Sequence, residues 1–396
     1  MTMPSLEQLT PPGMDFATDP YPLYAHLRER GPVHRVTAPD GTGVWLVVGH
    51  EQVRAALTDP RLRNDVRHSS TWEDDGGYAV GLNMLQTDPP HHTRLRKLVA
   101  KKFTARRIEA LRPRVQRIAD ELLDAMVPLG RADLVAAFAL PLPMSVICEL
   151  MGVPVEDREA FHGWSNETVH PSSPEAATAA AQAMTGYLAQ LIDGKRRVPD
   201  DDLLSALVRA MDDDGDRLSA EEILGMAFLL LVAGHETTVN LISTGALTLL
   251  GHPEQLSALR ADPGLVDGAV EEVLRYDGPA QSTSYRFTAE PVEIGGTVIP
   301  AGEAVLILLA SAGRDPRLAP DPDRFDIRRT GAARGHLGFG HGIHHCLGAP
   351  LARLEAGIAL RTLFERCPRL ALDRDPATLM WRPSLLRGVR ELPVRF

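Results

Sequence analysis

Apolar residues recur at intervals of three and four positions through most of the chain, which is the spacing of helices with one buried face. This spacing predicts helices over residues 91–128, 139–151, 175–195, 201–211, 219–250, 253–276 (interrupted at Pro263) and 350–367. Two regions favour β-structure: residues 33–48, with a turn at 39–41, and residues 291–309, where Gly295 and Gly296 form a hairpin turn pair. The predicted fold is therefore mainly α-helical with small β-sheets.

The predicted helix over residues 219–250 is long enough to cross the whole molecule. Ser219 and Glu222 have the spacing of a capping box, and Gly251-His252-Pro253 ends the pattern. A helix of this length spans about 48 Å, so much of it must be buried. Its centre nevertheless reads Ala233-Gly234-His235-Glu236-Thr237-Thr238. A mid-helix glycine and a buried carboxylate both reduce stability, so this polar segment indicates a functional requirement.

Composition adds limits to this picture. Hydrophobic residues make up 44% of the 396 residues and aromatic residues 5%, as expected for a helix-rich globule with a large core. Linkers and repeats are not evident, so we expect a single domain over 1–396. The sequence shows neither a signal peptide nor a membrane-spanning apolar run, which predicts a cytoplasmic protein. Three cysteines, Cys148, Cys346 and Cys367, argue against a disulfide framework.

The charge of the chain is unevenly distributed. A formal net charge of −10 argues against general nucleic-acid binding. Residues 94–117 nevertheless contain ten lysines and arginines and one acid, Glu109, which gives a net charge of +9. Such a run is usually a solvated helix face, and it is also the pattern expected of a docking surface for an acidic protein.

The strongest chemical signal is the decapeptide FGHGIHHCLG at residues 339–348. It places Cys346 in a glycine-rich loop directly before a predicted helix, where free N–H groups favour the thiolate that binds iron. Gly342 permits a tight turn, and Gly348 leaves room for a flat macrocycle. For Cys148 and Cys367, which lack this context, a buried inert thiol is the preferred interpretation.

This decapeptide resembles the heme-binding signature of the cytochrome P450 family at Phe339, Gly342, Cys346 and Gly348. His344 occupies the basic position that faces a heme propionate. The resemblance implies a cytochrome P450 fold, in which heme b lies between the long central helix and the cysteine loop, with Cys346 as the axial ligand of the heme iron.

Further matches to the family extend along nearly the whole chain. Glu272 and Arg275 resemble its Glu-x-x-Arg pair, and Arg324 resembles the third member of this buried structural triad. Alone, such a pair would be a surface ion pair of little weight. The family resemblance also implies three basic partners of the heme propionates: His92, Arg96 and Arg286.

The segment from Ala233 to Thr238 resembles the oxygen-activation motif of the family. On this resemblance, Ala233 and Gly234 border the iron and Gly234 opens room beside it, Thr237 hydrogen-bonds bound dioxygen, and Glu236 relays protons. The implied activity is insertion of one oxygen atom from O2 into an organic substrate by hydroxylation or epoxidation. The implied electron donors are a separate ferredoxin and its ferredoxin reductase.

Two other classes of protein remain as alternatives. His341, His344, His345 and Cys346 could be a zinc cluster of a hydrolase or a structural zinc protein, although ligands crowded within six residues converge poorly on one tetrahedral ion. A heme protein that senses gas or uses peroxide directly is the other alternative. The Glu236-Thr237 pair argues against it, because neither activity needs a proton relay for dioxygen.

Within the family, the stretches at 84–99, 230–243 and 336–356 most resemble actinobacterial enzymes that tailor macrolides and other polyketides in antibiotic biosynthesis. Terpenoids, steroids and fatty acids are alternative substrates. The expected substrate walls are residues 63–86, 164–174, 278–284 and 383–388. One of Glu73, Asp74 and Asp75 would contact a cationic amino sugar if these residues were more than a solvated acidic turn, with Met84 and Leu85 on the macrolactone.

Overall fold

The helical framework follows the predicted pattern in a computed structural model. The structure describes residues 4–38, 41–72, 83–101, 103–169, 171–210, 215, 217–331, 335–382 and 385–396. Its α-helices are α1 (Leu6–Leu9), α2 (Tyr21–Arg30), α3 (His50–Ala56), α4 (His91–Ala100), α5 (Ala105–Ala110), α6 (Arg112–Met126), α7 (Pro141–Met151), α8 (Arg158–Val169), α9 (Pro174–Arg197), α10 (Leu203–Val208), α11 (Ala220–Gly251), α12 (Pro253–Ala261), α13 (Val266–Asp277), α14 (Leu309–Gly313) and α15 (Ala349–Arg366).

The strands form small sheets, as predicted. They are β1 (Val33–Thr37), β2 (Gly43–Val47), β3 (Leu62–Arg63), β4 (Arg131–Asp133), β5 (Arg286–Thr288), β6 (Val292–Ile294), β7 (Thr297–Ile299), β8 (Ala304–Ile307), β9 (Ala371–Leu372) and β10 (Pro393–Arg395). One sheet has the order β1-β2-β8-β5-β3 and a second β4-β10-β9, while β6 pairs with β7. The β6–β7 hairpin turns at Gly295 and Gly296, whose φ angles of 56° and 82° suit glycine.

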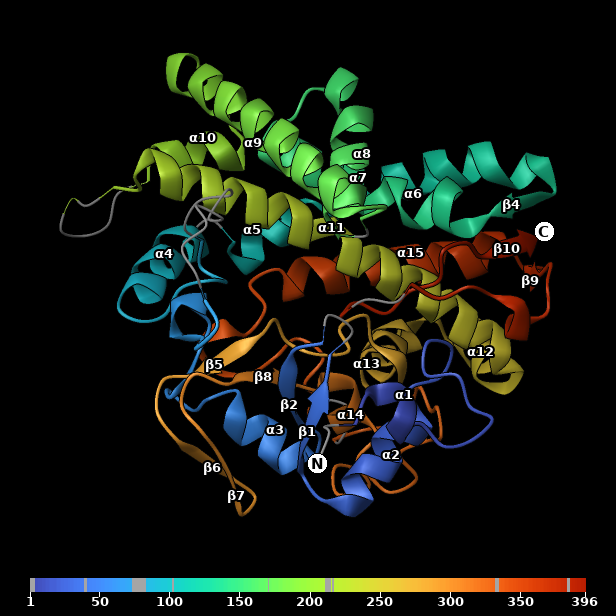
Figure 1. The fold of residues 1–396 in the computed structure, drawn as a ribbon. Coiled ribbons are helices and arrows are strands. Elements are labelled where there is room, and N and C mark those ends of the chain that lie inside the picture. The colour runs from blue at the N-terminus through green and yellow to red at the C-terminus, as the bar shows by residue number, and fades with distance from the viewer. Residues whose placement is uncertain are drawn as a thin grey trace.

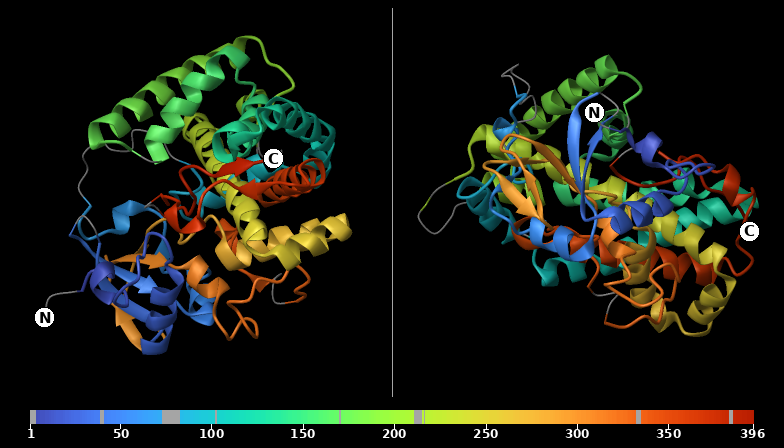
Figure 2. Two further views of the ribbon diagram at one scale, coloured as in Figure 1. Left: turned by 90° about the vertical axis from the view of Figure 1, so that its right-hand side faces the viewer. Right: turned by 60° about the horizontal axis from the view of Figure 1, so that its bottom comes forward.

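Helix α11 runs through the middle of the molecule, with α8 and α9 over its N-terminal half and α15 beside it (Figure 1). The sheet of β1, β2, β5 and β8 lies on the opposite side from α8 and α9, as the turned views also show (Figure 2). By length and composition α11 could cross a membrane, but 61% of its most apolar 18-residue window is buried inside the fold. These are the features of a core helix.

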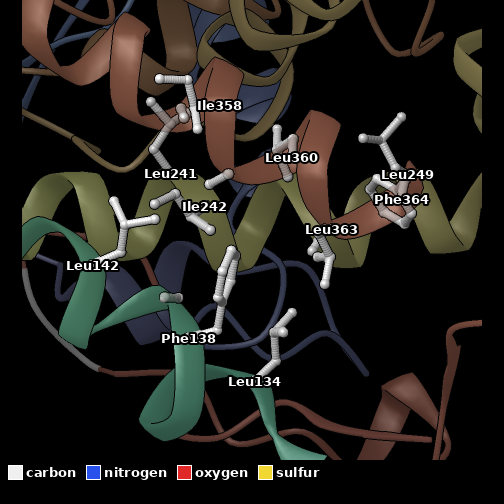
Figure 3. Packing of buried hydrophobic residues seen from close by; sticks show 14 of the residues in the cluster. Leu134, Phe138, Leu142, Leu241, Ile242, Leu249, Ile358, Leu360, Leu363 and Phe364 are labelled. Atoms are coloured by element: carbon white, nitrogen blue, oxygen red, sulfur yellow. The ribbon is translucent and has the colours of Figure 1, made fainter. Parts of the chain in front are cut away.

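The largest hydrophobic core joins α11 to α15 and to the chain around α7 (Figure 3). Leu241 and Ile242 of α11 pack in this core with Leu360 of α15 and with Phe138, which lies just before α7. At Gly245 the two long helices approach closely, since a Cβ there would lie 3.1 Å from Leu360 Cδ1. The core therefore fixes the spacing of α11 and α15.

Local capping and proline residues explain where the helices begin and end. The predicted capping box is confirmed: Ser219 Oγ accepts from the Glu222 backbone N–H at 3.1 Å, and Glu222 Oε2 accepts from that of Ser219 at 2.7 Å. The range 91–128 contains three helices, because Thr104 caps α5 and Pro113 lies in the first turn of α6. The range 164–174, predicted as a loop, is helical as far as Val169.

A buried ion pair ties α13 to the segment that precedes the cysteine loop. Arg275 donates to both carboxylate oxygens of Glu272, at 2.7 and 2.8 Å, and both side chains are fully buried. Arg275 Nη1 also donates to the carbonyl oxygens of Gly313 and Pro322, at 2.9 and 2.7 Å. Most of the donors of this guanidinium are therefore satisfied, as a buried charge requires.

The third side chain of this cluster is Arg329, and the prediction of Arg324 is wrong. Arg329 Nε lies 3.2 Å from Glu272 Oε1, whereas the side chain of Arg324 is 66% exposed and lies 3.8 Å from Asp326. The neighbouring Phe325 is buried against the core, which turns the preceding side chain outward. Arg324 contributes its carbonyl oxygen, which accepts from Arg275 and Arg329.

This arrangement separates the two arginines in a stability measurement. We expect Arg329→Ala to lower the free energy of unfolding by about 2 kcal/mol, because it removes one partner of a buried carboxylate that Arg275 still neutralises. Arg324→Ala should change it by less than about 0.5 kcal/mol. Urea denaturation of the two heme-loaded variants, followed by circular dichroism, makes the comparison. A larger loss for Arg324→Ala would contradict the assignment.

Candidate functional site

The cysteine loop is shaped by glycines and closed by a main-chain hydrogen bond. Gly340 and Gly342 have φ angles of +72° and +74°, and a Cβ at Gly342 would lie 3.0 Å from Thr58 Cγ2. The backbone N–H of Cys346 donates to the Phe339 carbonyl oxygen at 2.9 Å. The loop thus delivers Cys346 two residues before Gly348, the N-cap of α15, as predicted.

Cys346 differs from the other two cysteines in its surroundings. It is exposed, whereas Cys148 and Cys367 are buried, and burial raises the pKa of the Cys148 thiol to about 12. Packed protein atoms also raise the pKa of Cys346, and this effect outweighs the N–H groups of Gly348 and Ala349, which lower it. The helix N-terminus therefore acts in the predicted direction without deciding the outcome. Coordination of a cation would itself remove the thiol proton.

Phe339 of the cysteine loop is held by a cluster that the sequence did not reveal. The Arg353 guanidinium lies 4.5 Å above the Phe339 ring and donates from Nε to Glu271 Oε1 at 2.6 Å. His336 Nε2 lies 3.1 Å from the other carboxylate oxygen of Glu271. Burial raises the pKa of Glu271, but His336 and Arg353 outweigh it and lower this pKa to about 2. No sequence spacing relates these residues, which come from α13, the loop and α15.

The predicted basic partners of the cofactor converge from separate elements. His92 and Arg96 lie on α4, Arg286 lies on β5, and His344 lies in the cysteine loop. The rings of His92 and His344 are 4.2 Å apart, centroid to centroid, and Arg96 Nη2 donates to the His345 carbonyl oxygen at 2.5 Å. Both ring nitrogens of His92, Arg286 Nε and His344 Nε2 are buried without a hydrogen-bond partner in the structure.

These four groups disfavour one another's positive charge. Burial, followed by Arg286, His92 and Arg96, lowers the pKa of His344 to about 3. Burial lowers the pKa of Arg286 to about 10, although the charge of Asp88 acts in the opposite direction. Two carboxylates placed among these unpaired donors would gain charge-assisted hydrogen bonds. The residues present therefore fit the propionates of heme.

The polar centre of α11 faces open space at one point. Ala233 is exposed although it lies in the middle of a core helix, and Thr237 Oγ1 donates to its carbonyl oxygen at 3.2 Å. Glu236 is buried directly beside them. Gly234 serves a different purpose from the one predicted: a Cβ there would lie 3.0 Å from Ile147 Cδ1, so its missing side chain admits α7, and the prediction that it opens room beside the iron is wrong.

The histidines near Cys346 do not form a metal cluster with it. Within the described ranges, no group of three or more histidine, cysteine, aspartate or glutamate side chains converges as metal ligands. His344 turns toward His92, and the ring of His345 lies 6.4 Å from that of Phe339, centroid to centroid. Their side chains thus serve different neighbours, which disfavours the zinc alternative.

Comparison with known proteins agrees with this geometry over the full length of the chain. The family model for cytochrome P450 matches residues 171–263 and 264–387. Cytochrome P450 monooxygenase PikC of Streptomyces venezuelae is 60% identical over 387 residues, which cover 97% of this chain and 92% of PikC. The 6-deoxyerythronolide B hydroxylase of Saccharopolyspora erythraea is 46% identical over 408 residues, which cover 100% of this chain and 99% of the hydroxylase.

The fold agrees as well. The structure of the P450 monooxygenase TamI bound to tirandamycin C superposes with a TM-score of 0.89 at 46% identity, covering 96% of this chain and 99% of TamI. Fold, sequence and the cradle for an anionic cofactor lead to one assignment. The chain belongs to the cytochrome P450 family and is a monooxygenase that uses heme b.

Proposed function

We propose that this enzyme oxidises a macrolide or a related polyketide, by hydroxylation or epoxidation, in antibiotic biosynthesis. One observation carries the chemical part: the unpaired basic groups at His92, Arg286 and His344 surround the same space as the exposed Cys346 loop. Heme b bound there supplies the iron at which dioxygen is reduced and its O–O bond is split. The chain supplies the ligand, the propionate contacts and the protons.

Cys346 is the proposed axial ligand. It is exposed on the loop whose neighbour His344 belongs to the cradle, and Arg96, another member of the cradle, donates to the adjacent His345 carbonyl. N–H groups of Gly348 and Ala349 and the charge of Arg96 favour the thiolate. Electron donation from a thiolate ligand promotes O–O cleavage.

Ligation by Cys346 has a spectroscopic test. We expect the reduced carbon monoxide complex of the wild type to show the strongly red-shifted Soret band of thiolate-ligated heme. Cys346→Ser should lose this band, because a serine oxygen does not replace the thiolate. Cys367→Ser, a change at a buried cysteine remote from the loop, should retain it. A red-shifted band in Cys346→Ser would assign the ligand elsewhere.

Glu236 and Thr237 are the proposed oxygen-activation residues. Thr237 lies at the open face of α11 and its hydroxyl already donates to the Ala233 carbonyl, so it is held where it can exchange this partner for a ligand. Glu236 is buried next to it and can pass protons toward that face. Ala233 and Gly234 complete this stretch, with Ala233 open and Gly234 against Ile147.

Removing either group should uncouple the reaction. In Glu236→Ala and Thr237→Ala we expect heme binding to persist while product formation falls by about a hundredfold and electrons are diverted to peroxide, because a proton path is lost and no ligand is. Thr248→Ala, three turns further along α11, serves as the control. Peroxide and product formed per NADPH are the measurements, and unchanged coupling in both variants would contradict the roles.

The proposed electron donor is a small acidic ferredoxin, served by a ferredoxin reductase in the cytoplasm. Helix α4 carries part of the basic segment and lies against the cysteine loop through Arg96. Within that segment Arg94, Arg112 and Arg114 are engaged in ion pairs. The exposed positive charges that remain for long-range steering are those of Lys97, Lys101, Arg106, Arg107 and Arg117.

The substrate class is supported by the walls that the structure brings together. Three of the predicted wall segments contact each other or α11: Met84 N–H donates to Met226 of α11, and the backbone N–H of Gln281 donates to the Leu385 carbonyl oxygen at 3.0 Å. Leu85 and Leu385 are exposed apolar side chains on these segments. Glu73, Asp74 and Asp75 lie outside the described residues, so the contact with an amino sugar rests on sequence alone.

A titration tests the substrate class. Addition of macrolactones and glycosylated macrolides to the heme-loaded protein should produce the low-to-high-spin Soret difference spectrum of substrate binding, because an apolar ligand displaces water from the iron. Terpenoids, steroids and fatty acids form the comparison panel. Saturating spectra with one of those classes, and none with macrolactones or macrolides, would overturn the substrate class and leave the monooxygenase assignment intact.

A further inference from the structure

A buried polar contact joins α8 to the oxygen-activation segment of α11. Ser165 of α8 is completely buried, and its Oγ lies 3.3 Å from His235 Nε2. On the other side of the ring, His235 Nδ1 lies 2.8 Å from the Leu231 carbonyl oxygen. A carbonyl oxygen only accepts, so Nδ1 carries the proton and the Nε2 lone pair accepts from the Ser165 hydroxyl.

This arrangement leaves His235 without a proton for its neighbour. Glu236 Oε2 lies 4.0 Å from His235 Nε2, the nitrogen that has no hydrogen in the neutral ring. Burial lowers the pKa of His235, so the neutral form prevails at neutral pH. His235 therefore positions α8 against α11, and protons for Glu236 must come from another group.

His162 is placed to be that group. It lies three residues before Ser165 on α8, hence on the same face of the helix, and it is half-buried, with access to solvent. Burial lowers the pKa of His162, the carboxylate of Glu236 raises it, and the guanidinium of Arg382 lowers it. Arg382 Nη1 in turn donates to Asn166 Oδ1 on α8 at 3.5 Å. The titratable and charged groups at this point thus come from α8, α11 and the C-terminal segment.

We propose that His162 passes protons from solvent to the carboxylate of Glu236. In this step the imidazolium N–H bond of His162 breaks, an O–H bond forms on Glu236, and water returns a proton to the neutral imidazole; no electrons are transferred. A histidine with solvent access on one side and a carboxylate on the other can exchange protons at neutral pH. The inference rests on the proposed role of Glu236, and it adds α8 to the proton path.

The pairing can be measured without turnover. In the diamagnetic reduced carbon monoxide complex, labelled with carbon-13 histidine, the resonance that disappears in His162→Gln is that of His162. Glu236→Gln should lower the apparent pKa of this resonance by about one pH unit, because it removes a nearby negative charge. An unchanged titration curve would overturn the pairing, whatever Glu236 does in catalysis.

The function of the pair is tested by coupling as a function of pH, with a surrogate ferredoxin and its reductase and the macrolide that gives the largest spectral change above. His162→Gln and His162→Ala should both form several-fold less product per NADPH than the wild type, and both should lose an ionisation near the pKa of His162 from the pH profile. His26→Gln, which removes a histidine of α2 remote from α11, should match the wild type.

The outcomes separate the two proposals. Glutamine retains hydrogen-bonding capacity but carries no exchangeable charge, so full coupling in His162→Gln with loss in His162→Ala would show a purely structural role and overturn proton transfer. If Glu236→Gln lowers coupling and neither His162 variant does, this inference fails and the role of Glu236 stands. Unchanged coupling in Glu236→Gln would remove the basis of both.

Discussion

The structure depends on the burial of one long helix. Helix α11 passes through the molecule and packs against α7, α9, α13 and α15, so its side chains are apolar along most of its length. Only a helix held from several sides can keep a carboxylate, an imidazole and a hydroxyl in its middle at fixed positions, because each of them would otherwise draw water into the core. The cost in stability is met by the surrounding packing, and the polar segment opens at Ala233.

Cofactor binding and folding are coupled through the cradle. His92, Arg286 and His344 come from α4, β5 and the cysteine loop, which are distant in sequence, and their donors are buried before any anion satisfies them. Each of these groups lowers the charge that the others can hold. A dianion at this point removes that conflict, so cofactor binding should draw the three elements together.

Local pattern predicted local structure well, and tertiary contacts account for what it missed. The Ser219–Glu222 capping box, the Gly295-Gly296 hairpin and the cysteine loop depend on neighbours a few residues away, and the structure contains all three. Arg329 replaces Arg324 because burial of Phe325 decides which way the chain turns. Gly234 meets Ile147, and His162 meets Glu236, across helix pairs whose contacts no spacing in one sequence records.

The close approach at Gly245 gives this fold a built-in gauge. Because a glycine of α11 lies against Leu360 of α15, the distance between the two helices is set by a hydrogen atom where any other residue would place a carbon. Helix α15 begins just after Cys346, and α11 carries Thr237 two turns before Gly245. The height of the chamber between sulfur and hydroxyl is thus measured out in the apolar core, and evolution can vary the substrate walls without resetting it.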